Sequence, residues 1–258
     1  VTGVQPKLSL DIATNKTKNE TKRFSIVGLW GAYILKPPTA NYPQLPEVED
    51  LTMHLASVAK IEVVPHSLIR LQSGELAYVT KRIDRLKDTK LHMEDMCQLT
   101  ERLTEDKYHG SYEQIAKTIA KYSANPGLDV VRFFEQVVFS FLTGNADMHL
   151  KNFSLIRKAG DGYTLSPGYD MVATSIVNPA DDEDLALTLN GKKKKINRTD
   201  FIKAFETLKL DRKQQENIFK KMLKAKEEWD KMIDISFLSD EFKLAYSSII
   251  KNRFIRIN

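Results

Sequence analysis

The sequence of 258 residues has a single cysteine, Cys97, and no apolar run of the ~18 residues that a membrane-spanning helix needs. One cysteine excludes an intrachain disulfide, and such sparse use of cysteine is typical of a reducing compartment. Nothing near Cys97 in the sequence would stabilise a thiolate, so we expect this side chain to be buried and unreactive. We therefore expect a cytoplasmic protein with no membrane partner.

A glycine-rich phosphate loop of the Walker A type is also missing, because such a loop needs several glycines and a Lys-Ser/Thr pair. The first seven residues, VTGVQPK, contain one glycine. On pattern alone this segment is a weak signal. Its backbone N–H groups could nevertheless cover phosphates, with Gln5 and Lys7 as side-chain donors.

The excess of positive charge is small: 39 basic and 34 acidic residues give a net charge of +5. Much of it lies in Lys192–Lys195, directly after Asn190-Gly191. Asn-Gly followed by lysines is typical of a solvated hairpin tip. The alternative is an anionic docking site for a substrate, or for DNA held by a partner protein.

The first part of the chain is predicted to form mainly strands, because short apolar runs alternate with Gly, Pro and Asn. The expected strands are Lys7–Ala13, Arg23–Leu29, Ala32–Lys36, Glu62–Pro65, Ser67–Gln72 and Glu75–Arg82. One helix interrupts them at Pro46–Lys60, where Pro46 suits the first turn.

From about Ser111 the periodicity becomes helical. The expected helices are Ser111–Ser123, Asp129–Thr143 with Asp129 as its cap, Thr199–Leu208, Arg212–Met232 and Ser239–Lys251. We therefore expect an α+β, two-lobed, protein-kinase-like fold, with a small β-rich N-lobe (1–85) and a larger α-helical C-lobe (86–258). The joint would lie near Lys81–Arg85, where an adenine could meet the backbone.

The most informative pattern is Asp147 five residues before Asn152, between an apolar helix and an expected hairpin of Phe153–Arg157 with Tyr163–Leu165. Asp170 follows eighteen residues after Asn152. Phosphoryl transfer from ATP requires such a set: one carboxylate accepts the proton of the acceptor hydroxyl, while an amide and a second carboxylate hold Mg²⁺. A single Asp is more commonly a turn residue, but Asn152 and Asp170 favour the catalytic interpretation of Asp147.

Lys36 ends an apolar strand, where a lysine is costly unless its charge is paired. We expect it to contact ATP phosphates and a glutamate of the following helix, Glu49 rather than Glu47. The alternative is an exposed strand end beside Pro37.

His149 and Lys151 alternate with Asp147 and should face the same cleft. Lys151 could neutralise charge on the transferring phosphoryl group. His149 could contact the nucleotide or, alternatively, hold the loop together.

Several segments together resemble the HipA-like Ser/Thr protein kinases of bacterial toxin–antitoxin systems. They span roughly residues 1–195 in the order of that family: Gly3–Leu10, Tyr33–Pro37, Glu49 with Met53–Ala56, Tyr78–Arg85, His92–Asp95 with Gln98, Asn145–Leu155, Tyr169-Asp170, and Leu185–Leu187 with Asn190–Lys192.

The resemblance implies a role for each matching position of the site. It implies that Asp147 is the catalytic base, that Asn152 and Asp170 bind Mg²⁺, that Lys36 and Lys7 contact the ATP phosphates, that Lys81 and Ile83 border the adenine, and that His149 and Tyr169 line the nucleotide site.

Gly3–Lys7 would be the phosphate loop of the family and the place of its regulatory autophosphorylation. Members typically carry a Ser just before or within this loop. Thr2 is the candidate hydroxyl here, and a Ser upstream of Val1 is the alternative.

The resemblance also implies partners. The family phosphorylates aminoacyl-tRNA synthetases and is restrained by a helix-turn-helix antitoxin, so contact with DNA would be indirect. The chain resembles the shorter HipT type, whose small N-terminal subdomain is a separate protein; a truncated full-length kinase is the alternative.

We therefore expect a Mg²⁺/ATP-dependent protein Ser/Thr kinase that acts as a toxin. Two other classes remain open. One is a catalytically silent, kinase-like co-repressor scaffold in a DNA-bound antitoxin complex. The other is a kinase for a small molecule or a lipid.

Overall fold

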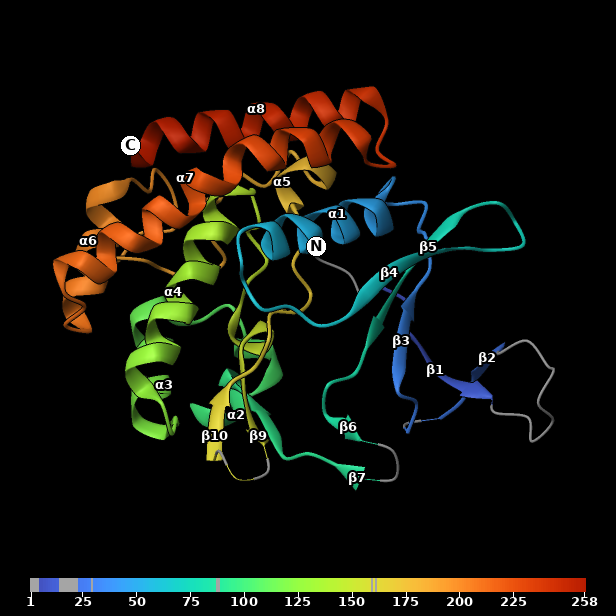
Figure 1. The fold of residues 1–258 in the computed structure, drawn as a ribbon, viewed down its shortest axis with the longest axis horizontal. Coiled ribbons are helices and arrows are strands. Elements are labelled where there is room, and N and C mark those ends of the chain that lie inside the picture. Colours follow the sequence, from blue (N-terminus) through green and yellow to red (C-terminus); the bar gives the residue numbers. More distant parts are fainter. Residues whose placement is uncertain (1–4, 14–22, 29, 87–88, 159, 161) are drawn as a thin grey trace.

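The computed structural model describes all residues except 1–4, 14–22, 29, 87–88, 159 and 161. Its N-terminal part is built on a five-stranded antiparallel sheet in the order β2-β1-β3-β5-β4 (Figure 1). The strands are β1 (Leu8–Ala13), β2 (Arg23–Ile26), β3 (Tyr33–Lys36), β4 (His66–Arg70) and β5 (Leu76–Lys81).

The two faces of this sheet bury different residues because side chains alternate along each strand. Leu35 and Val79 are opposite each other in the β3–β5 register and belong to a small buried cluster on one face. Lys36 and Tyr78 are the next opposed pair, and Tyr78 belongs to the main core on the other face. The register therefore directs Lys36 away from the small cluster and towards the interior.

Helix α1 (Leu45–Val58) lies between the sheet and the two C-terminal helices, α7 (Arg212–Ile235) and α8 (Asp240–Ile257) (Figure 1). A proline stands in its first turn, where a missing N–H costs nothing. The buried Trp229 indole donates to the Leu55 carbonyl at 2.8 Å, and the Thr52 and Tyr246 hydroxyls are 2.8 Å apart. These contacts tie α1 to both α7 and α8.

The C-terminal part is mainly helical. Its other helices are α2 (Met96–Leu99), α3 (Tyr112–Tyr122), α4 (Pro126–Leu142), α5 (Thr174–Val177) and α6 (Arg198–Thr207), with 3₁₀ turns η1 (Thr104–Asp106) and η2 (Leu150–Asn152). Helix α4 is buried over most of its length and carries the phenylalanines at the centre of the core. No helix in the described part of the chain is both long and apolar enough to span a bilayer.

The helical part also contains a three-stranded sheet, in the order β10-β9-β8. Its strands are β8 (Met93–Asp95), β9 (Ser154–Lys158) and β10 (Gly162–Leu165), and a short ribbon of β6 (Arg85–Leu86) and β7 (Thr89–Lys90) precedes it. The predicted hairpin corresponds to β9 and β10. The fold is thus α+β and two-lobed, with a small β-rich N-lobe and a larger helical C-lobe, as the sequence predicted.

Two predicted elements are wrong in detail. Glu62–Pro65 is not a strand: Val63 makes an isolated bridge to Gly168, and the Val64 N–H donates to the Gly168 carbonyl at 3.0 Å. Asp129 does not cap α4, which begins three residues earlier at Pro126. It is buried instead and accepts hydrogen bonds from the Ser123 hydroxyl at 2.6 Å and the Leu165 N–H at 2.8 Å.

The lysine run follows a tight turn. Asn190 and Gly191 have φ values of 49° and 74°, and Leu189 bridges to Lys192. Positive φ at both central residues is the geometry of a two-residue hairpin turn. Three of the four lysines pair with acids of this chain, Lys192 with Asp200, Lys193 with Glu183 and Lys194 with Asp182. The arrangement favours the hairpin-tip interpretation over an open anionic docking site.

Candidate active site

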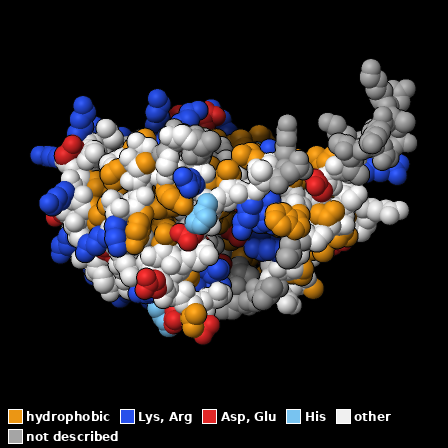
Figure 2. All heavy atoms as spheres, turned by 90° about the horizontal axis from the view of Figure 1, so that it is seen from below, with side chains coloured by type: hydrophobic (Ala, Val, Ile, Leu, Met, Phe, Trp, Pro, Cys, Tyr) orange, Lys and Arg blue, Asp and Glu red, His pale blue; other side chains and the backbone are white. Residues whose placement is uncertain are grey.

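Two adjoining cavities of about 610 and 390 Å³ lie where the five-stranded sheet meets the helical part. Lys7, Lys151 and Asp170 border both of them. In the space-filling view from below, basic side chains gather near the middle of this face, where the sheet and the helical part meet (Figure 2).

The described residues that the sequence predicted for the site all line one of these cavities. The larger cavity is lined by Gln5, Lys7, Lys36, Glu49, Asp147, His149, Lys151, Asn152 and Asp170, and the smaller one by Lys81, Ile83 and Tyr169 together with the three shared residues. Thr2 and Gly3 lie outside the described residues.

Lys36 is the centre of a charge cluster. Its Nζ lies 2.5 Å from Glu49 Oε1 and 2.6 Å from Asp170 Oδ1, and Lys7 Nζ lies 3.3 Å from Asp170 Oδ2. Lys36 and Glu49 are 3% and 2% exposed. The Lys36 ammonium also lies 5.4 Å from the Tyr78 ring centroid. A lysine at the end of β3 is therefore buried without leaving its charge unpaired, which removes the alternative of an exposed strand end.

Burial and the neighbouring opposite charges shift the pKa values of this cluster in opposite directions. Burial alone would lower the pKa of Lys36, but Asp170 and Glu49 outweigh it, so the pKa lies above its ordinary value. Burial would raise the pKa of Asp170, but Lys36 and Lys7 hold it well below its usual range. Burial raises the pKa of Glu49 to about 7, because Lys36 offsets the burial only in part. Lys36 and Asp170 are therefore charged at neutral pH.

The loop that carries Asp147 is held by hydrogen bonds from several elements. The Asn152 side-chain amide donates to the Asp147 carbonyl at 2.8 Å, and the Asp147 N–H donates to Asn145 Oδ1 at 3.1 Å. From outside the loop, the buried Tyr112 hydroxyl donates to the Met148 carbonyl at 3.0 Å. Because the Asn152 nitrogen is used within the loop, its Oδ1 is the atom that could meet a cation.

Asp147 has a partner that the sequence did not predict. The Tyr108 hydroxyl donates to Asp147 Oδ1 at 2.5 Å, and Tyr108 lines the same cavity. Burial and this hydrogen bond raise the pKa of Tyr108, so the phenol remains a donor at neutral pH. The two residues are 39 positions apart in the chain, and no sequence spacing indicates their contact.

His149 is buried beside Asp147. Burial lowers the pKa of His149 to about 4, so the imidazole is neutral at pH 7. Its ring packs edge-to-face on Tyr108, with the centroids 4.9 Å apart. Lys151 is held differently: its Nζ lies 2.9 Å from Asp95 Oδ2, and Asp95 also caps α2. Asp95 is the second site partner that the sequence did not single out.

The smaller cavity has a mixed apolar and polar wall. Ile34, Val64 and Ile83 supply apolar side chains, and the end of β5 brings Lys81 to its edge. The Tyr169 hydroxyl is fixed at the back, 2.5 Å from the Ser154 hydroxyl and 3.0 Å from the Lys151 carbonyl. A flat apolar ring with polar edges would fit such a wall.

The residues present fit a magnesium nucleotide. Asp170 and Asn152 both line the larger cavity, and carboxylate and amide oxygens are ligand types that Mg²⁺ prefers. Two lysines of the same cavity offer charge to phosphates. The Gln5 side-chain nitrogen is buried without a hydrogen-bond partner among the described residues, so it is a donor that a phosphate oxygen could satisfy.

Asp170 has a left-handed backbone, with φ of 52°. This conformation is uncommon outside glycine, although Asp tolerates it better than most residues, and it is found mostly in turns and at functional sites. It turns the chain so that the carboxylate meets both Lys36 and Lys7.

A model of the HipA-like C-terminal domain family matches residues 1–229. Among relatives, a Haemophilus influenzae protein named "Putative kinase" is 34% identical over 190 residues, which cover 68% of this chain and 52% of the relative. "Putative kinase Y4dM" of Sinorhizobium fredii is 34% identical over 184 residues, 67% of this chain and 44% of the relative. The chain thus spans about half the length of these relatives.

Solved structures with the same fold include two bacterial proteins. The HipA of a Shewanella oneidensis toxin–antitoxin complex with HipB and operator DNA matches with a TM-score of 0.79 and 21% identity, covering 100% of this chain and 64% of HipA. The proinflammatory kinase CtkA of Helicobacter pylori matches with a TM-score of 0.64 and 15% identity, covering 95% of this chain and 92% of CtkA. At these identities the likeness concerns the fold.

Proposed function

Because this chain belongs to the HipA-like C-terminal domain family, we propose that it is a Mg²⁺/ATP-dependent protein Ser/Thr kinase. The observation that carries the proposal is one cavity that contains Asp147, Asn152, Asp170 and the buried Lys36–Glu49 pair. A kinase needs a base, two oxygen ligands for a cation and an oriented lysine for the phosphates, and these residues supply all of them.

The proposed nucleotide site uses both cavities. Lys36, Lys7 and Gln5 bind the phosphates, and Glu49 orients Lys36. Asn152 and Asp170 bind Mg²⁺. The adenine lies in the smaller cavity against Lys81, Ile83 and Tyr169, with His149 on the phosphate side. Asp170 would hold the cation, and its pairing with Lys36 keeps its carboxylate ionised.

When bound, ATP supplies the phosphoryl group and Mg²⁺ neutralises its charge. Asp147 accepts a hydrogen bond from the acceptor hydroxyl and takes its proton as the hydroxyl oxygen bonds to the γ-phosphorus, while the bond from that phosphorus to the bridging oxygen breaks and ADP leaves. Tyr108 is a positioning residue, because its hydroxyl holds Asp147 Oδ1 and leaves the orientation of the carboxylate fixed. Lys151, at the border of the two cavities, is placed to stabilise charge on the transferring group.

We also propose that residues 1–85 and 86–258 act as the two lobes, with the nucleotide between them. The segment Gly3–Lys7 would be the phosphate loop, and Thr2 its autophosphorylated hydroxyl. A phosphate there adds about −1.5 to −2 charge. Such a loop would be repelled from a site meant for ATP phosphates, so modification would switch the kinase off.

The biological role that fits best is the toxin of a toxin–antitoxin pair. The Shewanella complex contains a HipA, a HipB and its operator DNA. By analogy we propose a helix-turn-helix antitoxin as partner, contact with DNA through that partner, and an aminoacyl-tRNA synthetase as the substrate.

Labelling with γ-³²P-ATP and Mg²⁺, alone and in cell extract, tests the proposal. Asp147→Asn should reduce labelling by about 10²- to 10⁴-fold, the usual contribution of a general base. Because Asn keeps an oxygen for Tyr108, its thermal unfolding should match the wild type. Asp230→Asn, at an exposed position on α7, is the matched control and should label normally.

Two results would contradict the assignment. Equal labelling by Asp147→Asn and the wild type would reject Asp147 as the base. No labelling of this chain or any other protein, although ATP binds, would favour the co-repressor scaffold. Label found only in small molecules or lipids would instead favour a kinase for a small molecule or a lipid.

A further inference from the structure

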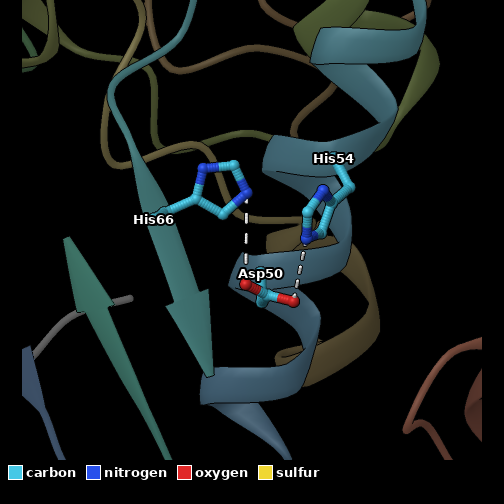
Figure 3. A group of neighbouring side chains, drawn as sticks. All are labelled: Asp50, His54 and His66. Carbon is cyan, nitrogen blue, oxygen red and sulfur yellow. Dashed lines mark ion pairs between the residues drawn. The ribbon is translucent and has the colours of Figure 1, made fainter. Parts of the chain in front are cut away.

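Three side chains converge where α1 meets β4, on a part of α1 that the proposed kinase site does not use. Asp50 and His54 are one turn apart on α1, and His66 begins β4 (Figure 3). The carboxylate lies between the two imidazoles, with one oxygen towards each ring. One ligand atom from each residue can be chosen so that all three lie within 4.8 Å of one another.

The polar atoms in this cluster approach each other without ordinary hydrogen bonds. His54 Nε2 lies 3.5 Å from Asp50 Oδ2, and His66 Nε2 lies 4.0 Å from Asp50 Oδ1. An N–H···O bond is normally about 2.7–3.2 Å long. His66 Nε2 and Asp50 Oδ1 are both buried and have no hydrogen-bond partner among the described residues. Buried polar atoms of this kind are rare and need an explanation.

The ring of His66 is already oriented for a ligand. Its Nδ1 lies 3.0 Å from the Val64 carbonyl, which makes Nδ1 the protonated nitrogen. The lone pair of Nε2 then points towards Asp50. A metal-bound histidine is usually fixed in this way, with its second nitrogen donating to a carbonyl or carboxylate. The His66 side chain is 5% exposed, so this orientation is enforced by packing.

The three ligand atoms lie near enough to one another for a single metal ion to be shared. Zn²⁺ binds imidazole nitrogen and carboxylate oxygen at about 2.0–2.2 Å in tetrahedral geometry, which places neighbouring ligand atoms about 3.3–3.5 Å apart. The two nitrogen–oxygen distances given above end on different oxygens of Asp50. One ligand atom from each residue lies within 4.8 Å of the other two, so binding would draw the three side chains closer together.

We propose that Asp50, His54 and His66 form a binding site for a divalent transition-metal ion, with Zn²⁺ as the best fit. Two imidazoles and one carboxylate favour such an ion over Mg²⁺ or Ca²⁺, which prefer oxygen ligands. The His54 side chain is 45% exposed, so the ion can enter from solvent and keep one position for water.

Metal at this site would join α1 to β4. Asp50 directly follows Glu49, the residue that holds Lys36. An ion bound by side chains from both elements would therefore stabilise the helix that orients the phosphate-binding lysine. The proposal does not depend on the kinase assignment, because it concerns binding and stability.

The experiment uses the full chain after treatment with a chelator and its removal. Zn²⁺ is titrated by calorimetry, Co²⁺ binding is followed by its visible d–d absorption, and the melting temperature is measured with and without Zn²⁺. We expect one tight Zn²⁺ per chain, tetrahedral Co²⁺ spectra and a rise in melting temperature of several degrees. His54→Ala should weaken Zn²⁺ binding about 100-fold and abolish the rise, and Asp50→Asn should do the same.

His54→Ala is the decisive variant, because a half-exposed side chain can be removed without unfolding the chain. His109→Ala is the matched control at an exposed histidine on another surface, and should bind like the wild type. Asp170→Asn tests whether the Zn²⁺ is bound in the proposed kinase cavity instead. We expect this variant to bind Zn²⁺ like the wild type. Equal Zn²⁺ affinity in His54→Ala and the wild type would overturn the proposal, as would the absence of tight binding or its loss in Asp170→Asn alone.

Discussion

The two faces of the five-stranded sheet are covered very differently. The inner face packs on α1, which is itself buried against α7 and α8, and belongs to the main core of the molecule. The outer face has a cluster of only four buried residues among those that the structure describes, Leu10, Leu35, Ala77 and Val79. On the edge strand β2, Phe24 is 43% and Ile26 72% exposed. Most of the packing of α1 is therefore shared with the helical lobe. The strands next to the proposed phosphate loop bury few apolar side chains on their outer face and should be less stable.

The two tryptophans test this contrast most strongly. Trp229 is fully buried and bonded to α1, whereas Trp30 is 72% exposed. Trp229→Ala should lower the free energy of unfolding by about 4 kcal/mol through the cavity it leaves. Trp30→Ala should change it by about 0.5 kcal/mol or less. Urea denaturation measures both, and similar losses for the two variants would show that α1 is not anchored as described.

The next largest effect concerns the charges between the sheet and α1. Lys36→Met removes the cation and leaves Glu49 and Asp170 facing each other, so we expect a loss of about 3 kcal/mol. Adding Glu49→Gln should restore most of the stability by removing one carboxylate, but ATP binding should remain weak. Denaturation together with calorimetry separates these outcomes. A double variant that binds ATP normally would contradict the proposed role of Lys36.

Leucine truncations compare the two cores directly. Leu142→Ala, in the main core, should cost about 4 kcal/mol, and Leu10→Ala, in the outer cluster, about 2 kcal/mol, because a thin layer can collapse onto a cavity. The difference of about 2 kcal/mol is the quantity to measure. Equal losses would mean that the outer face is as tightly packed as the inner one.

Two buried groups near the cleft should give opposite pH dependences. The pKa of Glu49 is raised from 4.5 to about 7, so the folded state holds a proton that the unfolded state has released, and stability falls as pH rises across this range. The pKa of His149 is lowered from 6.5 to about 4, so the unfolded state holds the extra proton, and stability is lost as pH falls from 6.5 to 4.

Single variants should reveal each contribution. Relative to the wild type, Glu49→Gln should gain stability as pH rises from 4.5 to 7, and His149→Asn should gain stability as pH falls from 6.5 to 4. Each slope can reach about 1.4 kcal/mol per pH unit for one proton. Urea denaturation at several pH values checks the signs. Parallel curves for the wild type and Glu49→Gln would show that Glu49 has an ordinary pKa.

Much of the site could be predicted from the sequence because its signals are local. Asp147 and Asn152 share one loop, and the place of Lys36 at the end of an apolar strand indicated that its charge is paired. The Lys36–Glu49 pair could be predicted as well, because an uncompensated lysine on a buried strand demands a carboxylate from the next element. Long helices with regular periodicity, such as α7, were located to within a few residues.

The remaining features depend on contacts between distant segments. Tyr108 and Asp147 meet only when the loop after α2 packs on the loop that carries Asp147, and the sequence around Tyr108 gives no sign of this contact. Asp129 is of a residue type that often caps helices. The helix begins earlier, at Pro126, so the Asp129 carboxylate instead accepts a hydrogen bond from the Leu165 N–H of β10. The pairing of His66 with Asp50 likewise requires the β4–α1 packing, which residue spacing does not encode.

The contacts of α1 with Trp229 and Tyr246 also bear on how fast the protein can change state. Any movement that turns Glu49 away from Lys36 must first separate the Trp229 indole from Leu55 and the Tyr246 hydroxyl from Thr52. Both contacts are buried, so separating them would leave buried polar groups without their partners, which is costly. In the proposed kinase we therefore expect the Lys36–Glu49 pair to stay closed while other segments move.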